Sequence, residues 1–587
     1  MNCLLTDIGS TYIKYCVYDD TSQNTEYSDK LKFPEPSIND GKRFIVPTEE
    51  IKKAVLEIFD KVKGYGVKKA FFSVQMHGYI LKKGEIFGDY VSWRDKSADI
   101  STCGIEKKDF SAFGTSLKDN LPAAKLVFYA KKETEENAEF FTLGSYVSFL
   151  LCGKNASHIS DLCASGFFYS DSGALNELAG NMTMPKAYMA VSAVGEHDGI
   201  TIYTPVGDHQ ASFLGSGAEY DKYLVNIGTA TQISCLGGNI SVSAHGVYNA
   251  AQCEFRPYFD SKTRLYTVSG LIGGDRIFGG SGNEKDKLYE QILHALEYLP
   301  KKRGIVFGGG GSELVYEDFK EKFAKIGIEC LKKNKDIGTE GLKMISDQNR
   351  IKSGTMLSEI PFDNFPVIAK NCGLDFFIID NEHGGFDYSA ILRLATISSL
   401  ASIRAVARIG DSSRSHITKL ADMGIRAFLL PMTNTAGDIQ KVVEYAKYPP
   451  LGKRGVSTTR AHTLYNPPSL SEYMPKANSE MKIYAQIETV LGVENVEDIL
   501  KVPGVDGIFI GPNDLSVDIG CADDKTPVYD YIKKASDAAN SAGKVWGIIT
   551  TDKKLIDFSI LHGAGMISVG SELNMLINGC KKIKEMF

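Results

Sequence analysis

The sequence predicts an α/β protein whose C-terminal part is a parallel (β/α)8 barrel. Eight short apolar runs follow one another in that part, and amphipathic, helix-like segments separate them. Such alternation is typical of parallel strands joined by crossover helices. About 235 residues follow position 352, which is close to the usual length of such a barrel. The runs occupy residues 355–357, 376–380, 405–408, 427–432, 483–485, 507–510, 545–549 and 566–570.

Composition excludes several classes of protein. The chain has 587 residues, a length that suggests about three or four domains, and a formal net charge of −6. It has no long basic run of the kind that binds nucleic acid, and no apolar run reaches the roughly 18 residues of a membrane span. The first residues do not resemble a signal peptide, and the 11 cysteines include no Cys-x-x-Cys pair. We therefore expect a cytoplasmic protein with reduced thiols and no structural zinc, nucleic-acid partner or membrane partner.

Two N-terminal segments, about 200 residues apart, share one pattern. In each, an apolar strand leads into a turn of small residues and a returning strand; the turns are Gly9-Ser10-Thr11 and Gly228-Thr229-Ala230-Thr231. Such a turn can cradle phosphate oxygens, and Asp7 beside the first turn could hold a hydrated Mg²⁺. Each turn alone could equally be an ordinary hairpin. A third apolar strand ends in the glycine run 308–311, where the backbone could approach a nucleotide closely.

Five further motifs follow one another along the chain. They are Phe72-Ser73-Val74-Gln75-Met76-His77-Gly78, Ser92-Trp93-Arg94-Asp95, Pro205-Val206-Gly207-Asp208-His209-Gln210-Ala211-Ser212, Val225-Asn226-Ile227-Gly228-Thr229 and Glu254-Phe255-Arg256-Pro257-Tyr258. In this order they resemble the FGGY carbohydrate kinases, and most closely their sedoheptulokinase-like branch. The resemblance covers residues 1 to about 346 and implies a duplicated, ribonuclease H-like fold of the sugar kinase/actin type, with subdomains at 1–205 and 206–346.

This resemblance implies ATP with Mg²⁺ as cosubstrate and assigns roles to individual residues. Asp208 would be the base that accepts a proton from the sugar hydroxyl. Asp7 would hold Mg²⁺ through water. The sugar would contact Gln75, His77, Trp93 and Asp95, although Trp93 and His77 could instead be core residues. The remaining ATP and phosphate contacts would be Gly9, Ser10, Thr11, Gly228, Thr229, Thr231, Gly309, Gly310 and Gly311.

Two departures from the kinase pattern leave questions open. Ser97 stands where the family often has Arg, so the choice of sugar is not determined. This half of the chain is also short for the family. A ligand-binding or scaffolding module without transferase activity is therefore the alternative to a kinase.

Polar residues follow several of the C-terminal runs, at the end where active sites of parallel barrels form. His383, Arg408, Glu488 and Asp514 are expected at one mouth of the barrel. Glu488 and Asp514 are separated by about one strand–helix–strand unit, so they should lie at neighbouring strand ends. Two adjacent carboxylates suit a hard divalent cation. Alternatively, Asp514 caps a helix and Glu488 pairs with an arginine.

Five segments stand out in this part of the chain: 379–384, 430–435, 448–456, 486–489 and 507–516. Through them, residues 354–587 resemble the class II pyruvate aldolases of the HpcH/HpaI family, so a TIM-barrel domain is expected at 350–587. The resemblance implies that Glu488 and Asp514 bind Mg²⁺, Mn²⁺ or Co²⁺, that Arg408 stabilises the oxyanion and that His383 is the acid–base group.

Further roles follow from the same resemblance. Asp422 would pair with His383, either within the chain or from a neighbouring subunit of a homo-oligomer. Gln486 and the segment Gly511-Pro512-Asn513 would bind pyruvate. A Schiff-base lysine is the rival chemistry, but Lys544 precedes a strand and is interpreted as structural.

The sequence as a whole therefore predicts a bifunctional enzyme of carbohydrate metabolism. One half would phosphorylate a ketose or related polyol. The other half would cleave or form a 2-keto-4-hydroxy acid from pyruvate and an aldehyde.

Overall fold

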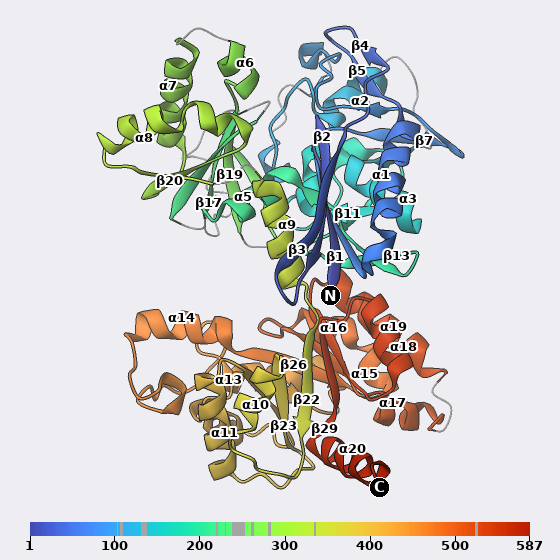
Figure 1. The fold of residues 1–587 in the computed structure, drawn as a ribbon, viewed down its shortest axis with the longest axis vertical. Coiled ribbons are helices and arrows are strands. Elements are labelled where there is room, and N and C mark those ends of the chain that lie inside the picture. Colours follow the sequence, from blue (N-terminus) through green and yellow to red (C-terminus); the bar gives the residue numbers. More distant parts are fainter. Residues whose placement is uncertain are drawn as a thin grey trace. The chain divides into compact units, whose positions relative to one another are not determined.

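The computed structural model divides the chain into two compact units, Met1–Asn349 and Arg350–Phe587 (Figure 1). It describes residues 1–587 except 103, 106–109, 131–137, 219–220, 229–230, 238–252, 260–262, 280–282, 334–335 and 523–525. Among the described residues, no helix has both the length and the apolar character needed to cross a membrane.

The first unit begins with a seven-stranded sheet in the order β13-β14-β6-β1-β2-β3, and β15 also pairs with β6. Helices α1 (Thr48–Val62) and α3 (Leu143–Cys152) pack on one face, whereas α5 (Asp208–Ser216) and α9 (Ile337–Gln348) pack on the other. The strands are β1 (Asn2–Ile8), β2 (Tyr12–Asp19), β3 (Asn24–Lys32), β6 (Lys69–Val74), β13 (Ala193–His197), β14 (Ile200–Tyr203) and β15 (Val206–Gly207).

A six-stranded sheet in the order β18-β19-β17-β16-β20-β21 forms the second half of this unit. Helices α6 (Gly274–Gly279), α7 (Asn283–Tyr298) and α8 (Tyr316–Ala324) accompany it, and α7 and α8 contribute to its apolar core. The strands are β16 (Lys222–Ile227), β17 (Thr231–Gly237), β18 (Glu254–Pro257), β19 (Arg264–Leu271), β20 (Gly304–Gly308) and β21 (Glu329–Lys332).

The two sheets repeat one arrangement, which confirms the predicted duplication. In the first, β1 pairs antiparallel with β2 and parallel with β6. In the second, β16 pairs antiparallel with β17 and parallel with β20. Helices α5 and α9 cross so closely that a Cβ on Gly341 would lie 1.9 Å from the Ala211 carbonyl oxygen.

Three smaller sheets and two helices complete the first half of this unit. Two three-stranded sheets join β4 (Ile38–Asn39), β5 (Phe44–Val46) and β9 (Tyr90–Val91), and β10 (Glu139–Phe141), β7 (Ile80–Lys83) and β8 (Ile86–Phe87). Strands β11 (Ala156–His158) and β12 (Lys186–Tyr188) pair in parallel, and the remaining helices of this part are α2 (Pro122–Ala130) and α4 (Ile159–Leu162).

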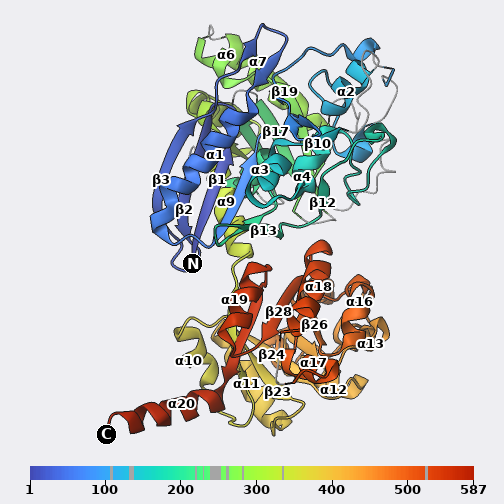
Figure 2. The ribbon, with the colours of Figure 1, turned by 90° about the vertical axis from the view of Figure 1, so that its right-hand side faces the viewer.

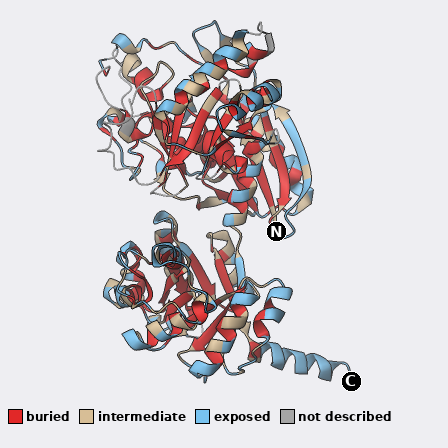
Figure 3. Cartoon of the chain, turned by 90° about the vertical axis from the view of Figure 1, so that its left-hand side faces the viewer, coloured by how far each residue is buried: buried red, intermediate tan, exposed pale blue. Residues whose placement is uncertain are grey.

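The second unit is a closed barrel of eight parallel strands in sequence order, as the eight apolar runs predicted. Its interior holds apolar side chains such as Phe376, Val406 and Phe509, and a larger apolar cluster lies between the strands and the helices. Figure 3 shows the strands of the barrel coloured mainly as buried. The strands are β22 (Lys352–Leu357), β23 (Phe376–Asn381), β24 (Arg404–Ile409), β25 (Ala427–Leu430), β26 (Lys482–Ile487), β27 (Gly507–Ile510), β28 (Val545–Ile549) and β29 (Met566–Ser571).

Helices follow the strands around the barrel. They are α10 (Phe365–Asn371), α11 (Tyr388–Leu400), α12 (Arg414–Asp422), α13 (Ala436–Ala446), α14 (Leu470–Glu480), α15 (Val490–Glu494), α16 (Val496–Lys501), α17 (Pro512–Ile519), α18 (Val528–Ser541), α19 (Lys553–Leu561) and α20 (Glu572–Glu585).

The last helix, α20, differs from the others because it projects from the barrel (Figure 2). Its first residue, Glu572, is buried and accepts hydrogen bonds from the amides of Ser358, Glu359 and Ile360 at 2.6–3.0 Å. The rest of the helix is largely exposed, including Leu576 and Ile577, which are 53% and 51% exposed.

Candidate active sites

A cavity of about 190 Å³ in the first unit brings both halves of the duplicated fold together. The β1–β2 turn, the segment after β6 and the start of α5 contribute from the first half. The β16–β17 hairpin and β18 contribute from the second. Its lining residues are Ser10, Gln75, Met76, His77, Trp93, Asp208, Asn226, Gly228, Gln232 and Arg256. Three of the four predicted sugar contacts therefore share a cavity with the predicted base.

Asp208, the first residue of α5, lines this cavity and forms an acidic pair with Asp7 of β1, whose charge acts on it. Burial and the nearby charge of Asp7 raise the pKa of Asp208 to about 7. Burial also raises the pKa of Asp7, although its carboxylate accepts a 2.5 Å hydrogen bond from the Ser73 hydroxyl. Gly338 of α9 approaches Asp7 closely, since a Cβ there would lie 2.9 Å from Asp7 Oδ2. Asp208 thus has a proton affinity suited to a general base near neutral pH.

His77 and Gln75 present hydrogen-bonding groups near this pair. The His77 Nδ1–H donates to the Ala164 carbonyl at 2.8 Å, because that oxygen can only accept. Burial, together with the charges of Lys118 and Arg256, lowers the pKa of His77 to about 3, so the ring is neutral and its Nε2 is an acceptor. Gln75 is buried, and its Oε1 has no hydrogen-bond partner among the described residues.

Asp95, the fourth predicted sugar contact, does not line the cavity. Its carboxylate holds a loop together instead: it accepts bonds from the Phe44 amide at 2.9 Å and the Ser97 hydroxyl at 2.5 Å. The Lys125 ammonium lies 3.4 Å away and is fully buried. The residue that departs from the kinase pattern, Ser97, is therefore a structural partner of Asp95. A sugar contact by Asp95 stays a prediction.

The predicted phosphate residues gather where glycine backbones approach one another. The Gly274 amide donates to the Gly228 carbonyl at 2.8 Å, and a Cβ on Gly311 would lie 3.3 Å from the Gly274 Cα. Gly309 has a φ of 81°, and a Cβ there would lie 2.5 Å from the Asn226 Oδ1. These positions leave no room for larger residues, whereas Gly310 faces open space.

The other predicted phosphate contacts have mixed surroundings. The Gly9 amide donates to the Tyr12 carbonyl at 3.1 Å and closes the first turn, on which Ser10 lines the cavity. Thr11 is exposed, and its carbonyl accepts from the Phe33 amide. Thr231 is buried, and its hydroxyl donates to the Ile272 carbonyl at 2.6 Å. Thr229 lies outside the described residues.

A buried ionic cluster beside the cavity was not predicted as part of the site. Glu254 of β18 is 4% exposed and pairs with both Lys118 and Arg256. Burial acts to raise the pKa of Glu254, but the two positive charges outweigh it and hold that pKa well below its usual value. The sequence could have indicated Glu254 and Arg256 as site residues, because both lie in one of the kinase-like motifs. It gave no such indication for Lys118, which lies in no motif.

Glu488, directly after β26, is the buried carboxylate of the barrel mouth. It is 3% exposed, and it accepts hydrogen bonds from the Met432 amide at 2.9 Å and from Gln486 Nε2 at 2.7 Å. Gly511 must be glycine here, because a Cβ would lie 2.4 Å from Glu488 Oε1. Burial and the neighbouring charge of Asp514 raise the pKa of Glu488, although the Met432 amide and the charge of Arg408 oppose that rise.

Arg408 of β24 is held by a fork of hydrogen bonds. Its Nε and Nη2 donate to the two oxygens of Asp380 on β23, at 3.0 and 2.7 Å. Its Nη1 lies 3.3 Å from Glu382, whose carboxylate is 3.8 Å from His383 Nε2. Asp380 also accepts from the amides of Glu382 and His383. Asp380 and Glu382 were not predicted as site residues, although both precede His383 at a predicted strand end.

Asp514 lies in the first turn of α17 and is exposed, as is Asn513, whereas Pro512 is buried. The charge of Asp514 contributes to the raised pKa of Glu488, so the two predicted metal ligands are neighbours at the mouth. The described residues contain no group of three or more His, Cys, Asp or Glu side chains that could hold a metal ion. Two neighbouring carboxylates nevertheless fit a hard cation that takes its remaining oxygens from water and substrate.

Asp422 and His383 are not paired within this chain. Asp422 ends α12, and its carboxylate lies 2.7 Å from Arg454 Nη2. Its carbonyl accepts from His462 Nδ1 at 3.1 Å. His383 is mostly exposed, with 76% of its side chain accessible. A pairing of the two residues stays a prediction that needs another subunit.

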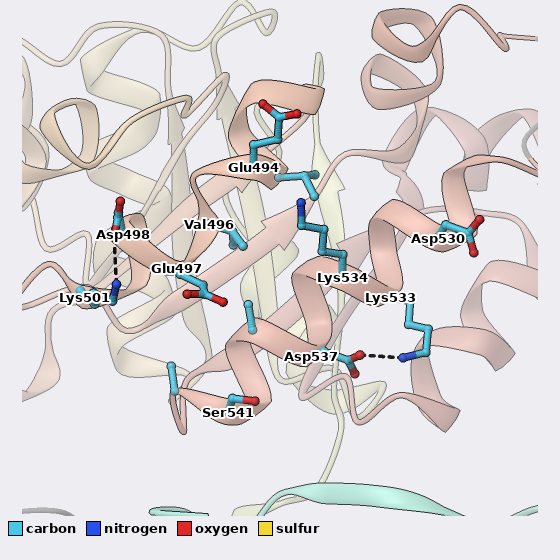
Figure 4. A pocket seen from close by; sticks show the side chains of 13 residues that line it. Glu494, Val496, Glu497, Asp498, Lys501, Asp530, Lys533, Lys534, Asp537 and Ser541 are labelled. Carbon is cyan, nitrogen blue, oxygen red and sulfur yellow. Dashed lines mark hydrogen bonds and ion pairs between the residues drawn. The ribbon is translucent and has the colours of Figure 1, made fainter. Parts of the chain in front are cut away.

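Two other features do not belong to the barrel mouth. Lys544 precedes β28, at the amino end of the strand, and donates to the Val505 carbonyl. A groove of about 760 Å³ is lined by helices α15, α16 and α18 and by none of the mouth residues (Figure 4). Its charges include pairs within one helix, such as Lys501–Asp498 and Lys533–Asp537, so we assign it no reaction.

Comparison with known proteins places the second unit in a family. Residues 366–579 match the model described as HpcH/HpaI aldolase/citrate lyase. The chain is 33% identical, over 226 residues, to a 2-keto-3-deoxy-L-rhamnonate aldolase from Klebsiella pneumoniae, covering 38% of this chain and 83% of that protein. It is also 33% identical, over 224 residues, to a hydroxypyruvate/pyruvate aldolase from Roseobacter denitrificans, covering 37% of this chain and 85% of that protein.

The first unit has the fold of sugar kinases. A ligand-bound xylulose kinase from Lactobacillus acidophilus superposes with a TM-score of 0.51 at 16% identity. The match covers 59% of this chain and 89% of that chain. At this identity the likeness shows the fold alone.

Proposed function

Because the chain belongs, through residues 366–579, to the HpcH/HpaI aldolase/citrate lyase family, we propose that its barrel is a divalent-metal-dependent aldolase. The reaction is cleavage or formation of a 2-keto-4-hydroxy acid, with pyruvate and an aldehyde as the fragments. The observation that carries this proposal is the mouth itself: a buried Glu488 beside Asp514 and a fixed Arg408.

The side chains of the mouth support that chemistry. Glu488 and Asp514 would hold Mg²⁺, Mn²⁺ or Co²⁺, which when bound supplies Lewis-acid polarisation of the pyruvate keto group. Arg408 places fixed positive charge where negative charge develops on the keto oxygen, and Asp380 keeps its guanidinium in that orientation. Gln486 and the Gly511-Pro512-Asn513 segment would orient the pyruvate carboxylate.

His383 is the group that accepts the proton of the aldol hydroxyl during cleavage. In cleavage, that hydroxyl loses its proton, the C3–C4 bond breaks, and the bonding electrons remain on the pyruvate fragment. His383 follows β23, and its Nε2 lies 3.8 Å from the Glu382 carboxylate. Asp422 from a neighbouring subunit would orient the imidazole.

We propose further that the first unit is an ATP-dependent sugar kinase with Asp208 as general base. As the sugar hydroxyl oxygen forms its bond to the γ-phosphorus, its proton passes to Asp208 and ADP leaves. Support comes from the cavity that joins Asp208 to Gln75, His77 and Trp93, and from the glycine contacts around Gly228 and Gly309. Asp7 would position the Mg²⁺ that accompanies ATP.

The aldolase proposal is tested by release of pyruvate from a panel of 2-keto-4-hydroxy acids. We expect activity that EDTA removes and Mg²⁺, Mn²⁺ or Co²⁺ restores. We also expect loss of activity in Glu488→Gln and Asp514→Asn. Full activity of both variants would exclude the assigned ligands.

The kinase proposal is tested by phosphorylation of a broad panel of sugars, polyols and sugar acids with ATP and Mg²⁺. We expect at least one substrate whose turnover falls by about 10²-fold or more in Asp208→Asn. Equal turnover in wild type and variant would favour a ligand-binding module over a kinase.

We propose that the protein is a homo-oligomer assembled through the barrel unit. The apolar side chains Met575, Leu576, Ile577 and Ile583 of α20 are 48–60% exposed, which is costly for a helix that stays in water (Figure 3). A second copy of the chain would cover them. Light scattering tests this: the double variant Leu576→Glu, Ile577→Glu should have a lower mass than wild type, and an unchanged mass would argue against α20 as the interface.

A further inference from the structure

The cavity of the first unit carries positive charge that the proposed phosphoryl transfer to a neutral sugar does not use. Arg256 lines the cavity and is only 5% exposed. Its Nε and Nη2 donate to Glu254 Oε2 at 2.8 and 2.6 Å, and its Nη1 donates to Gln232 Oε1 at 3.2 Å. The ammonium of Lys118 pairs with the other oxygen of Glu254.

Among the described residues, this cluster has one positive charge more than its carboxylate neutralises. The other polar contacts that the structure describes for it are neutral: Ser116 donates to Glu254 at 2.7 Å, and Lys118 donates to the Ser269 hydroxyl at 3.1 Å. The charges of the cluster act on His77, which lines the cavity: Lys118 and Arg256 lower the pKa of His77, and Glu254 opposes them. A positive charge in a buried site is stable only when an anion or strong dipoles compensate it.

Asp208 also lines the cavity, and Asp7 lies near it, but the proposed reaction gives both carboxyl groups another task. In the proposed reaction Asp208 takes up a proton and Asp7 faces the Mg²⁺. Neither then compensates Lys118 and Arg256 in the substrate complex.

We propose that this cavity binds a sugar acid, with the substrate carboxylate at Arg256 and Lys118 and a hydroxyl group at Asp208. A carboxylate carries one negative charge, which matches the surplus, whereas a phosphate monoester at pH 7 carries about −1.5 to −2. The guanidinium fork of Arg256 also has N–H groups beyond the three that bond Glu254 and Gln232, and a planar carboxylate can accept from them.

The phosphoryl transfer and the roles given to Asp7 and Asp208 rest on the proposed kinase function, whereas the contact of a carboxylate with Arg256 does not. Binding of a sugar acid also relates the two units chemically. The barrel acts on a 2-keto-4-hydroxy acid in our proposal, and a phosphorylated aldonate would become such an acid after a dehydration that removes the C3 hydroxyl and turns C2 into a keto group.

The test compares aldonates of five to seven carbons with the alditols of the same configuration, which differ only in replacing the carboxylate by a hydroxymethyl group. Binding to the full chain is measured by calorimetry. In the pair that binds best, we expect the aldonate to bind at least ten-fold more tightly than the alditol. Lys118→Gln should remove that preference, and Glu254→Gln should increase it.

Lys53→Gln is the matched control, because Lys53 is an exposed lysine of α1 that also pairs with a carboxylate, Glu50, at 2.6 Å. It should leave the preference unchanged. If a variant fails to fold, the comparison of aldonate with alditol on the wild-type protein still decides, because only the aldonate carries the carboxylate that the surplus positive charge would bind.

The proposal is overturned if alditols bind as tightly as aldonates, if no aldonate binds at about 10 mM, the practical limit of such a titration, or if Glu254→Gln leaves the ratio unchanged. Phosphorylation assays on the same panel separate this from the kinase proposal. Neutral sugars phosphorylated without binding of aldonates would leave the kinase standing and refute the inference. Selective binding of aldonates without any phosphorylation would support the binding inference and argue against the kinase proposal.

Discussion

Replacing Asp208 with Asn should stabilise the first unit at alkaline pH while it abolishes phosphoryl transfer. The pKa of Asp208 is raised from its usual 3.8 to about 7, so the folded unit holds this proton more tightly than the unfolded chain. Folding stability therefore falls as the pH rises from about 4 to about 7, and the loss is complete above that range. A change of this size corresponds to about 4 kcal/mol as an upper value, which solvent in the cavity will reduce.

The amide side chain introduced by Asp208→Asn is neutral at every pH, so it resembles the protonated carboxyl group. At a pH of about 8.5 the Asp208→Asn protein should unfold at a temperature a few degrees above wild type in its first-unit transition. At a pH of about 4.5 the two proteins should unfold together. Calorimetry at both pH values, with the barrel transition as the internal reference, is the assay.

Two results would refute this reasoning. A variant that is less stable than wild type at the alkaline pH would mean that the Asp208 carboxylate is stabilised by partners such as Arg256. A stability difference that is the same at both pH values would mean that ionisation of Asp208 is not its cause.

Three other substitutions follow from the geometry of the two sites. Gly511→Ala places a Cβ 2.4 Å from Glu488 Oε1, so it should lower metal-dependent aldol cleavage at least about ten-fold with the fold retained. Gly437→Ala is the control, because a Cβ there makes only an ordinary contact of 3.7 Å with Thr435 Oγ1, and equal activities of the two variants would contradict the close approach. Arg408→Lys keeps the charge but loses the fork to Asp380, so kcat should fall by about 10²-fold, and the surface variant Arg393→Lys is its control. Gly309→Ala combines a φ of 81° with a contact 2.5 Å from Asn226 Oδ1 and should abolish the ATP-induced rise in the unfolding temperature, while Gly310→Ala should keep it.

The barrel could be predicted because each of its strands is recognisable from its own residues as a short apolar run. Strands buried on both faces, such as β23 and β27, read as unbroken apolar runs, and the residue after each run is placed at the mouth by topology alone. This is why Arg408 and Glu488 could be placed at the mouth from the sequence. The duplicated hairpins of the first unit were recognisable for the same reason.

Side-chain partners were less predictable, because they depend on contacts between distant segments. The Lys118–Glu254 pair joins residues far apart in sequence, and Lys118 belongs to no motif. Asp95 was assigned to the sugar from its motif, but Ser97 and Lys125 engage its carboxylate in a loop. Asp422 was assigned to His383, but within one chain it pairs with Arg454.

The measurement that tests the central claim most directly is exchange of the pyruvate methyl protons in D₂O, followed by NMR. It needs no knowledge of the aldehyde, because formation of the enolate alone exchanges the protons. We expect exchange with Mn²⁺ or Mg²⁺, none with EDTA, and none in Glu488→Ala. Absence of exchange with every metal, or exchange that persists in Glu488→Ala, would contradict the assignment of the barrel mouth as a pyruvate enolate site.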